Sequence, residues 1–295
     1  MHHRMRNLFV VILLMVLCVM FFPTPTSGVK MSETCVILDN FHIPDYRISG
    51  SIIPESNFGN RDDCSFLEIK GDWNKIIYLE DAPGGSIDVN FKFYTTFFIN
   101  PDENLQLPEQ VGSFALDAGW TFRFGNGCAL QPRIMPGIYW DMENMDSDMF
   151  SIPFSLMFIK AWNSQISGYL GLQVRPDFER EIIPLIGLAC APTDEWRFDI
   201  GIPHTRLSYF ANPDITLFLD LIWQNTSYLV TEGKDRWLTL EDIRSSAGGI
   251  WRVVDELHLG IEGGYVFERS IKFEKSSKID ISNSLFGSIS IMTFF

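Results

Sequence analysis

The residues best suited to catalysis are a histidine and a serine four positions apart, His204 and Ser208. In a serine hydrolase the imidazole must lie within hydrogen-bond reach of the hydroxyl whose proton it accepts. On an extended strand these two side chains would share a face but lie about 13 Å apart. The pair therefore favours a rim histidine over a catalytic dyad, and an outer-membrane enzyme acting on lipid is kept as an alternative function.

Metal and cofactor chemistry has little support. Acidic residues cluster in three polar stretches: Asp62 with Asp63, Asp141 with Glu143, and Asp146 with Asp148. A dedicated calcium loop places its oxygen ligands at fixed spacings around a glycine, and none of these stretches does so. The chain also contains no phosphate loop, dinucleotide fingerprint or zinc-ligand cluster. We expect solvated loops, no metal and no cofactor.

Four cysteines follow the N-terminal segment: Cys35, Cys64, Cys128 and Cys190. Disulfides form in the oxidising compartments that exported proteins reach. Four cysteines allow three pairings. Cys35 with Cys64 is the favoured disulfide because both lie in the same polar stretch, and free buried thiols are the other interpretation.

Charged residues alternate with apolar ones in several segments, which is the period of a strand with two different faces. A lysine or arginine on the lipid face of a membrane barrel costs about 2–4 kcal/mol at mid-membrane. The charged face should therefore point into a lumen, where its residues either pair and fill the space or line a charge-selective pore. The polar candidates for this lumen are Asp88, Asn90, Lys92, Asp117, Arg123, Arg175, Arg197, Asp199, Asp220 and Glu262.

The segment 279–295, IDISNSLFGSISIMTFF, shows the same alternation at the end of the chain. Its expected lipid face comprises Ile279, Ile281, Leu285, Ile289, Ile291 and Phe295, opposite a row of serines and Asp280. A final strand of this kind is typical of the closing strand of an outer-membrane barrel. We interpret the terminal aromatic Phe295 as a signal for the barrel-assembly machinery.

The alternating segments are long for a soluble sheet. The stretch beginning at Ser86 runs for about 13 residues, against the usual 5–6 of a soluble strand and the roughly 9–11 that cross a bilayer at a tilt. We count about 11 such segments from Ser86 onward, and because single-chain bacterial barrels use even numbers we predict about 12 strands, with 10 as the alternative. A soluble periplasmic β protein is the competing fold, because antiparallel sheets in water also alternate.

Charge and hydropathy exclude other classes. The formal net charge is -14, which disfavours nucleic acid as a partner. Beyond the N-terminus no apolar run reaches the roughly 18 residues of a membrane-spanning helix. Aromatic residues make up 14% of the chain, which fits a lipid-facing surface with aromatic girdles.

The N-terminus reads as an export signal. Arg4 and Arg6 precede an apolar core from Leu8 to Phe22, and small residues follow up to a preferred cleavage after Gly28. The predicted domains are a signal peptide at 1–28, an irregular leader at 29–85 that is periplasmic or partly lumenal, and an antiparallel up-and-down barrel at 86–295.

Several stretches resemble a family of bacterial outer-membrane β-barrels of unassigned function, notably PLIGLACAP followed by WRFDIGIP. The resemblance implies a bacterial outer-membrane location and a barrel fold, and it supplies no catalytic residues. The expected function is passive, porin-like transport of small solutes or ions, or a structural role in the membrane. The expected partners are outer-membrane lipid and the barrel-assembly machinery.

Overall fold

The computed structural model describes residues 44–57, 63–79, 85–100, 107–143, 147–230, 237–274 and 278–294. The predicted signal peptide, Cys35 and Phe295 lie outside these residues. Among the described residues, no helix is both long and apolar enough to cross a membrane.

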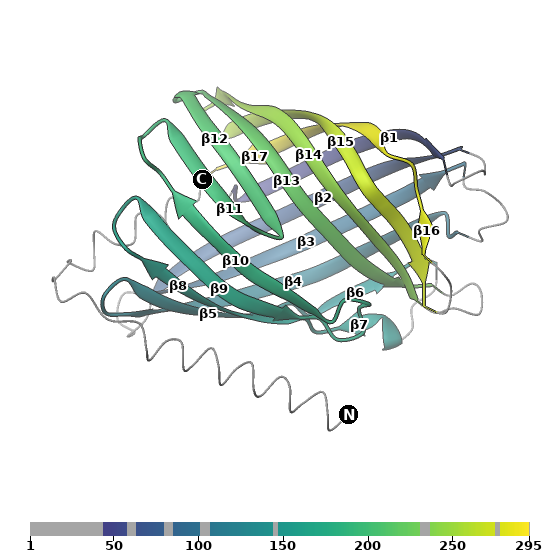
Figure 1. Cartoon of the computed structure of the whole chain (residues 1–295), viewed down its shortest axis with the longest axis horizontal. Coiled ribbons are helices and arrows are strands. Elements are labelled where there is room, and N and C mark those ends of the chain that lie inside the picture. Colours follow the sequence, from purple (N-terminus) through teal and green to yellow (C-terminus); the bar gives the residue numbers. More distant parts are fainter. Residues whose placement is uncertain are drawn as a thin grey trace.

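The chain forms an all-β, antiparallel, closed barrel (Figure 1). Each strand pairs with its neighbour in the sequence, and the last strand pairs with the first. The strands are β1 (Tyr46–Asn57), β2 (Asp63–Leu79), β3 (Gly85–Ile99), β4 (Gln110–Phe124), β5 (Cys128–Ile134), β6 (Gly137–Trp140), β7 (Phe150–Ser151), β8 (Phe154–Ala161), β9 (Ile166–Val174), β10 (Ile182–Cys190), β11 (Trp196–Ile202), β12 (His204–Asn212), β13 (Ile215–Leu229), β14 (Trp237–Val254), β15 (Leu257–Phe273), β16 (Ile279–Asp280) and β17 (Ser284–Thr293).

These segments make 14 barrel strands, because three strands are interrupted and carry two labels each: β5 with β6, β7 with β8, and β16 with β17. Pro136 and Pro153 sit in two of the breaks, where a proline cannot donate a ladder hydrogen bond. The third break turns Ile281 into the core. Ile279 also packs against this core. The predictions of 12 or 10 strands, and of Ile279 and Ile281 on the lipid face, are therefore wrong.

The error in strand number lies wholly in the predicted leader. From Ser86 onward the barrel has the 12 expected strands, and the two additional ones, β1 and β2, lie within 29–85. β1 pairs with β17 and β2 pairs with β3, so both belong to the wall. Gly50 and Pro54 interrupt the apolar alternation of β1. The barrel therefore begins at Tyr46, and the predicted boundary at Ser86 is corrected.

The two ends of the barrel differ in their connections. The end where β1 begins and β17 finishes has short turns, such as 125–127, 213–214 and 255–256. We call it the termini end. The opposite end carries longer connections, including 100–109, 141–149, 175–181 and 230–236, and we call it the long-loop end.

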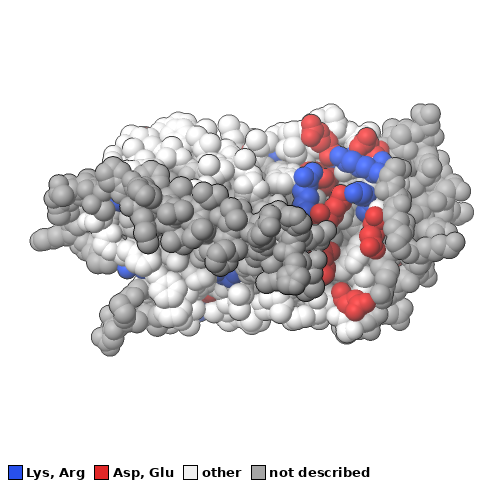
Figure 2. Space-filling model, turned by 60° about the horizontal axis from the view of Figure 1, so that its bottom comes forward, with Lys and Arg blue, Asp and Glu red and all other residues white. Residues whose placement is uncertain are grey.

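A belt of exposed apolar side chains covers the outer face. On β17, Leu285, Ile289 and Ile291 are exposed while the serines between them are buried. β13 repeats the pattern with Leu217, Leu219 and Leu221. On the outer face shown in Figure 2, the charged side chains of described residues gather toward the long-loop end, and the described surface elsewhere is largely uncharged.

The wall is not equally tall all round. β11 and β12 are joined through Pro203 alone, and in Figure 1 their turn lies partway along the neighbouring β10 and β13. β13 continues beyond this turn, and at Leu229 it forms a parallel bridge to Trp140 of β6 on the far side of the strand order. The end of β13 at the long-loop end therefore meets β6 while it stays paired with β14, and the barrel is narrower there.

Candidate functional site

The lumen is closed at the long-loop end by an apolar cluster. Its members come mainly from the long-loop ends of β1 to β4, β6 and β13 to β17, among them Ile53, Phe66, Val111, Tyr228 and Ile271, each at most 1% exposed. Phe178, from the connection between β9 and β10, joins the cluster and packs edge-on against Tyr139 at 5.0 Å between ring centroids. This end is therefore packed like a protein core.

A buried group of charges lies against the apolar cluster. Arg244 donates to both carboxylate oxygens of Glu68 at 2.6 Å and also bonds Asp242 at 2.8 and 3.0 Å. Arg269 approaches the same two carboxylates at 3.4 and 3.5 Å, and its guanidinium lies 4.0 Å above the Phe66 ring. These four side chains, which we call the charge plug, are each no more than 8% exposed.

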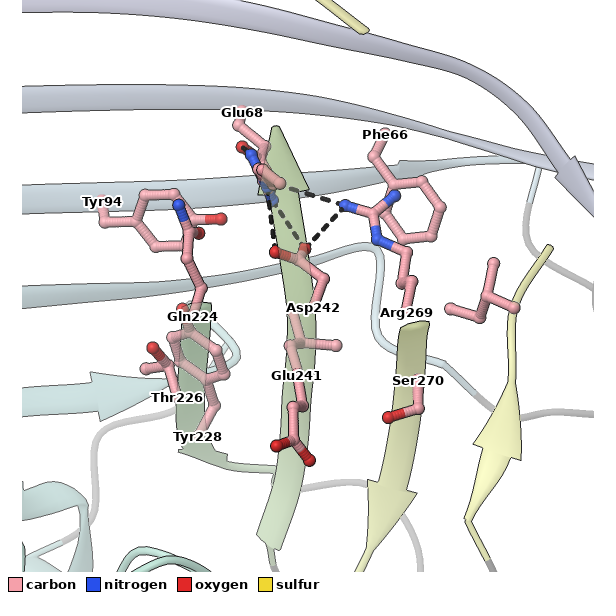
Figure 3. A pocket seen from close by; sticks show the side chains of 13 residues that line it. Phe66, Glu68, Tyr94, Gln224, Thr226, Tyr228, Glu241, Asp242, Arg269 and Ser270 are labelled. Carbon is pink, nitrogen blue, oxygen red and sulfur yellow. Dashed lines mark hydrogen bonds and ion pairs between the residues drawn. The ribbon is translucent and has the colours of Figure 1, made fainter. Parts of the chain in front are cut away.

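The charge plug joins strands that are far apart in the sequence. Glu68 comes from β2, whereas Asp242 and Arg244 come from β14 and Arg269 from β15. Figure 3 shows Glu68 above Asp242, with Arg269 reaching both. The cavity among them has a volume of about 30 Å³, room for only a few water molecules. This cavity is therefore too small for a solute larger than water.

A second charge group lies on β3, β4 and β5, nearer the termini end. Lys92 contacts Asp117 at 2.7 Å, and Arg133 donates to Asp117 at 2.8 Å while also pairing with Asp88. These residues occupy the face opposite the exposed Phe93 and Phe114. They therefore line the lower lumen.

A third group lies on β11, β12 and β13. Arg206 and the His204 imidazole both contact Asp220, with Arg206 Nε at 2.7 Å and His204 Nε2 at 3.0 Å from Oδ1. Beside it, Arg197 pairs with Asp199 at 2.9 Å. In the strand order these strands lie on the other side of the barrel from β3 to β5.

The two lower groups keep contact with solvent even though they lie on the inner face. The side chains of Lys92 and His204 are 41% and 46% exposed, and that of Arg206 is 27% exposed. The charge plug, by contrast, is sealed. The lumen is therefore a charged, water-accessible chamber on the side of the termini end, and it is closed at the long-loop end, which we also call the upper end.

Flat-lying rings help to keep the chamber open. The Tyr169 ring covers Gly187 and Gly201 so closely that an added Cβ would fall 2.4 and 2.2 Å from its hydroxyl oxygen. Phe218 lies on Gly248 in the same way and carries the Arg206 guanidinium 4.5 Å above it. Glycine lets these rings lie against the wall instead of standing into the lumen.

The structure brings several of the predicted lumen residues together. Asp88, Lys92 and Asp117 share one group, Arg197 and Asp199 form a pair, and Asp220 belongs to the third group. Glu262 accepts a hydrogen bond from Ser246 at 2.5 Å. Asn90 and Arg123 lie partly buried on β3 and β4.

Arg175 is the member that lies apart. It stands at the end of β9 and donates to the backbone oxygen of Asn225 at 2.5 Å and to its side-chain oxygen at 2.8 Å. Its place is beside the long-loop end of β13.

Sequence reasoning missed the charge plug. Glu68 fell in the predicted leader, and period-two counting places Arg269 on the same face as Phe267. A bulge at Glu268, whose φ is +52°, shifts the register of β15 and turns Arg269 inward. No local pattern identifies the group, because its members are distant in sequence: Glu68 and Arg244 are 176 positions apart, and Arg269 lies farther still from Glu68.

The remaining candidates for chemistry stay separate. Among the described residues no group of three or more His, Cys, Asp or Glu side chains could hold a metal ion. His204 contacts Asp220, while Ser208 is buried and pairs with Phe218. Cys64 is a free, buried thiol. Cys128 and Cys190 are also free but less buried, and Cys35 lies outside the described residues.

Comparisons with solved structures found barrels at low sequence identity. The COG4313 outer membrane channel from Pseudomonas putida F1 gives a TM-score of 0.42 at 9% identity, covering 92% of this chain and all of that one. The NanC porin gives 0.41 at 6% identity, covering 85% of this chain and all of that one. The KdgM porin gives 0.38 at 10% identity, covering 84% and 99%.

No curated protein matches the chain in sequence. A family model does match, over residues 128–284, which is more than half of the chain and begins within β5 rather than at Ser86. Its description is Domain of unknown function (DUF6268). This chain belongs to the DUF6268 family.

Proposed function

We propose that this protein is a gated outer-membrane channel for small hydrophilic solutes and ions. The observation that carries the proposal is the water-accessible, ion-paired lower lumen beneath a sealed upper end. A chamber lined with ion pairs can hold water and small polar solutes. Because the chamber is closed at one end, passage through it requires a gate at that end.

The outer surface supports the membrane location. A barrel in water buries its apolar residues inside, whereas this one exposes Ile289, Leu219 and Ile261 at 53–68% and keeps ion pairs inside. This is the arrangement of a transmembrane barrel, whose outward band is apolar and whose interior is polar. It speaks against the soluble periplasmic alternative.

The connections support an orientation. Bacterial outer-membrane barrels have short periplasmic turns and longer extracellular loops. By this rule the termini end faces the periplasm, and the charge plug closes the extracellular side. Outer-membrane lipid and the barrel-assembly machinery are then the expected partners.

The lining supports transport with weak ion selectivity. The lower groups present Lys92, Arg133 and Arg206 beside Asp88, Asp117 and Asp220, so neither sign of charge dominates. A pore selects by charge when rings of one sign line it. We expect cations and anions to pass at comparable rates once the gate is open.

The lipid-hydrolase alternative finds no support in the contacts of His204. Its imidazole binds a carboxylate that is shared with Arg206, and the serine expected to act with it is buried four residues along the strand. We therefore propose no reaction at this position.

Conductance across a planar bilayer tests the proposal. The wild-type protein should be closed most of the time. Arg244→Ala removes the short contacts that join Glu68 to Asp242 and leaves only the longer contacts from Arg269, so it should increase the open fraction at least tenfold. Arg252→Ala is the matched control, because Arg252 pairs with Asp214 on the surface at the termini end. Silence from every variant at all voltages contradicts a channel, and equal, steady conductance from all three contradicts the gate.

A further inference from the structure

We propose that the barrel opens sideways between β10 and β13, and that this opening passes single-chain amphiphiles between the lumen and the outer leaflet of the membrane. The inference rests on the proposed channel function for its orientation and its hydrated lumen. It adds a second route and a second class of substrate.

The hydrogen-bonded wall is interrupted on this side. Pairing between β10 and β11 begins at Ile186 with Ile202, so residues 182–185 of β10 have no partner on β11. Pairing between β12 and β13 ends at His204 with Ile222, followed by one hydrogen bond from Trp223 to Pro203. Above Pro203, the described strands β10 and β13 therefore face each other without an intervening ladder. We call this interruption the seam.

The seam begins within the apolar belt. β11 has 7 residues, fewer than the roughly 9–11 that a strand needs to cross a bilayer at a tilt. Ile200 and Ile202 at its upper end are 55% and 45% exposed. The turn at Pro203 therefore lies below the upper edge of the membrane, and lipid tails reach the seam.

Side chains, rather than strand pairing, close the seam. The connection 175–181 crosses from β9 to the upper part of β13, where Arg175 bonds Asn225 and the Glu179 amide donates to Ser227 Oγ at 3.2 Å. Two surface ion pairs hold its far side: Arg180 with Glu241 at 2.9 Å, and Lys272 with Glu179 at 2.5 Å.

The two ion pairs among these closing contacts are weaker than the ladders elsewhere. Ladder hydrogen bonds form cooperatively along a strand, whereas exposed ion pairs contribute little. Arg180, Lys272 and Glu179 are 50%, 36% and 37% exposed. The seam is thus a part of the wall that can open without breaking a strand ladder, and its opening breaks the exposed ion pairs together with the buried bonds from Arg175 to Asn225.

The surfaces on the two sides of the seam define the substrate class. Toward the lipid, Ile182, Ile186 and Leu221 are 46–51% exposed. Toward the lumen, Asp220 of β13 pairs with His204 and Arg206 of β12, which lie beside the turn at Pro203. A molecule that fits both sides has an apolar chain in the membrane and a polar head in the hydrated lumen.

A reversible crosslink across the seam tests this inference. The native cysteines are first replaced by alanine. Glu179→Cys and Ser227→Cys then place a disulfide where the Glu179 backbone amide now contacts the Ser227 side chain. The control pair is Ala247→Cys with Gly263→Cys, which face each other across the continuous ladder of β14 and β15. Both proteins are measured oxidised and reduced, so each serves as its own folding control.

The protein is inserted into vesicles whose bilayer carries a quencher, and a fluorescent fatty acid is added on the side from which the lumen is accessible. The loss of fluorescence reports transfer of the fatty acid into the bilayer. Ion conductance is recorded on the same protein. Oxidation of the seam pair should slow transfer at least fivefold and reduction should restore it, while conductance changes less than twofold. Transfer that is equal in the oxidised and reduced protein overturns the lateral route. Absent conductance with lock-sensitive transfer overturns the axial channel instead.

Discussion

At the residue scale, the properties of the barrel depend on where its charges lie. In the charge plug, buried charges regain the interactions that they lose on leaving water, since Arg244 makes bidentate hydrogen bonds with both Glu68 and Asp242. A buried ion is tolerated only when its partners replace the lost solvation. The same residue types on the surface, such as Arg252 with Asp214, have no such constraint.

We therefore expect Arg244→Ala to lower the free energy of unfolding by about 3–5 kcal/mol, because it removes the closest partner of two buried carboxylates and leaves them only the longer contacts from Arg269. Arg252→Ala should cost about 0–1 kcal/mol, the usual value of an exposed pair. Urea titration of the protein in detergent micelles measures both. Equal losses in the two variants would mean that the charge plug is not buried in solution.

At the element scale, alternation places most of the strands but not their irregularities. β17 follows the serine and isoleucine pattern over its whole length, and the charged faces of β3, β4 and β11 were readable from their residues. The register shift at Glu268 and the inward turn of Ile281 could not be predicted from the sequence, because breaks in a ladder are set by packing across the barrel rather than by local sequence. β1 was missed for a related reason, and 66–79, which could be read as an early strand, was not counted in the barrel: glycine, proline and inward-facing charges blur the alternation of both strands.

Ile289→Lys tests the lipid-facing assignment of β17. Ile289 is 64% exposed in the middle of the strand, where a lysine costs about 2–4 kcal/mol if lipid surrounds it. Asp280→Lys is the control, since its side chain is 85% exposed at the long-loop end. Heat-modifiable migration on a gel reports the folded fraction. A barrel that folds equally well with either lysine would contradict a lipid-facing belt at Ile289.

At the scale of the whole molecule, the barrel is a chamber with unequal ends. The fold class, the family and the inward direction of many charges followed from the sequence, because period-two alternation and strand length are local properties. The closure of the lumen at one end did not follow, because it depends on the end of β13 meeting β6 and on Glu68 meeting Arg244, contacts between distant parts of the chain. Length and composition alone do not distinguish an open pore from a filled one.

The most direct test of this two-ended chamber is the accessibility of one lumen position from each side of the outer membrane. Lys92→Cys places a thiol at the most exposed part of the β3 group, in a background without native cysteines. A membrane-impermeant maleimide should label it in cells with a permeabilised outer membrane and leave it unlabelled in intact cells, and adding Arg244→Ala should allow labelling in both. Rapid labelling of Lys92→Cys in intact cells with the charge plug unaltered would contradict a lumen that is closed at its long-loop end.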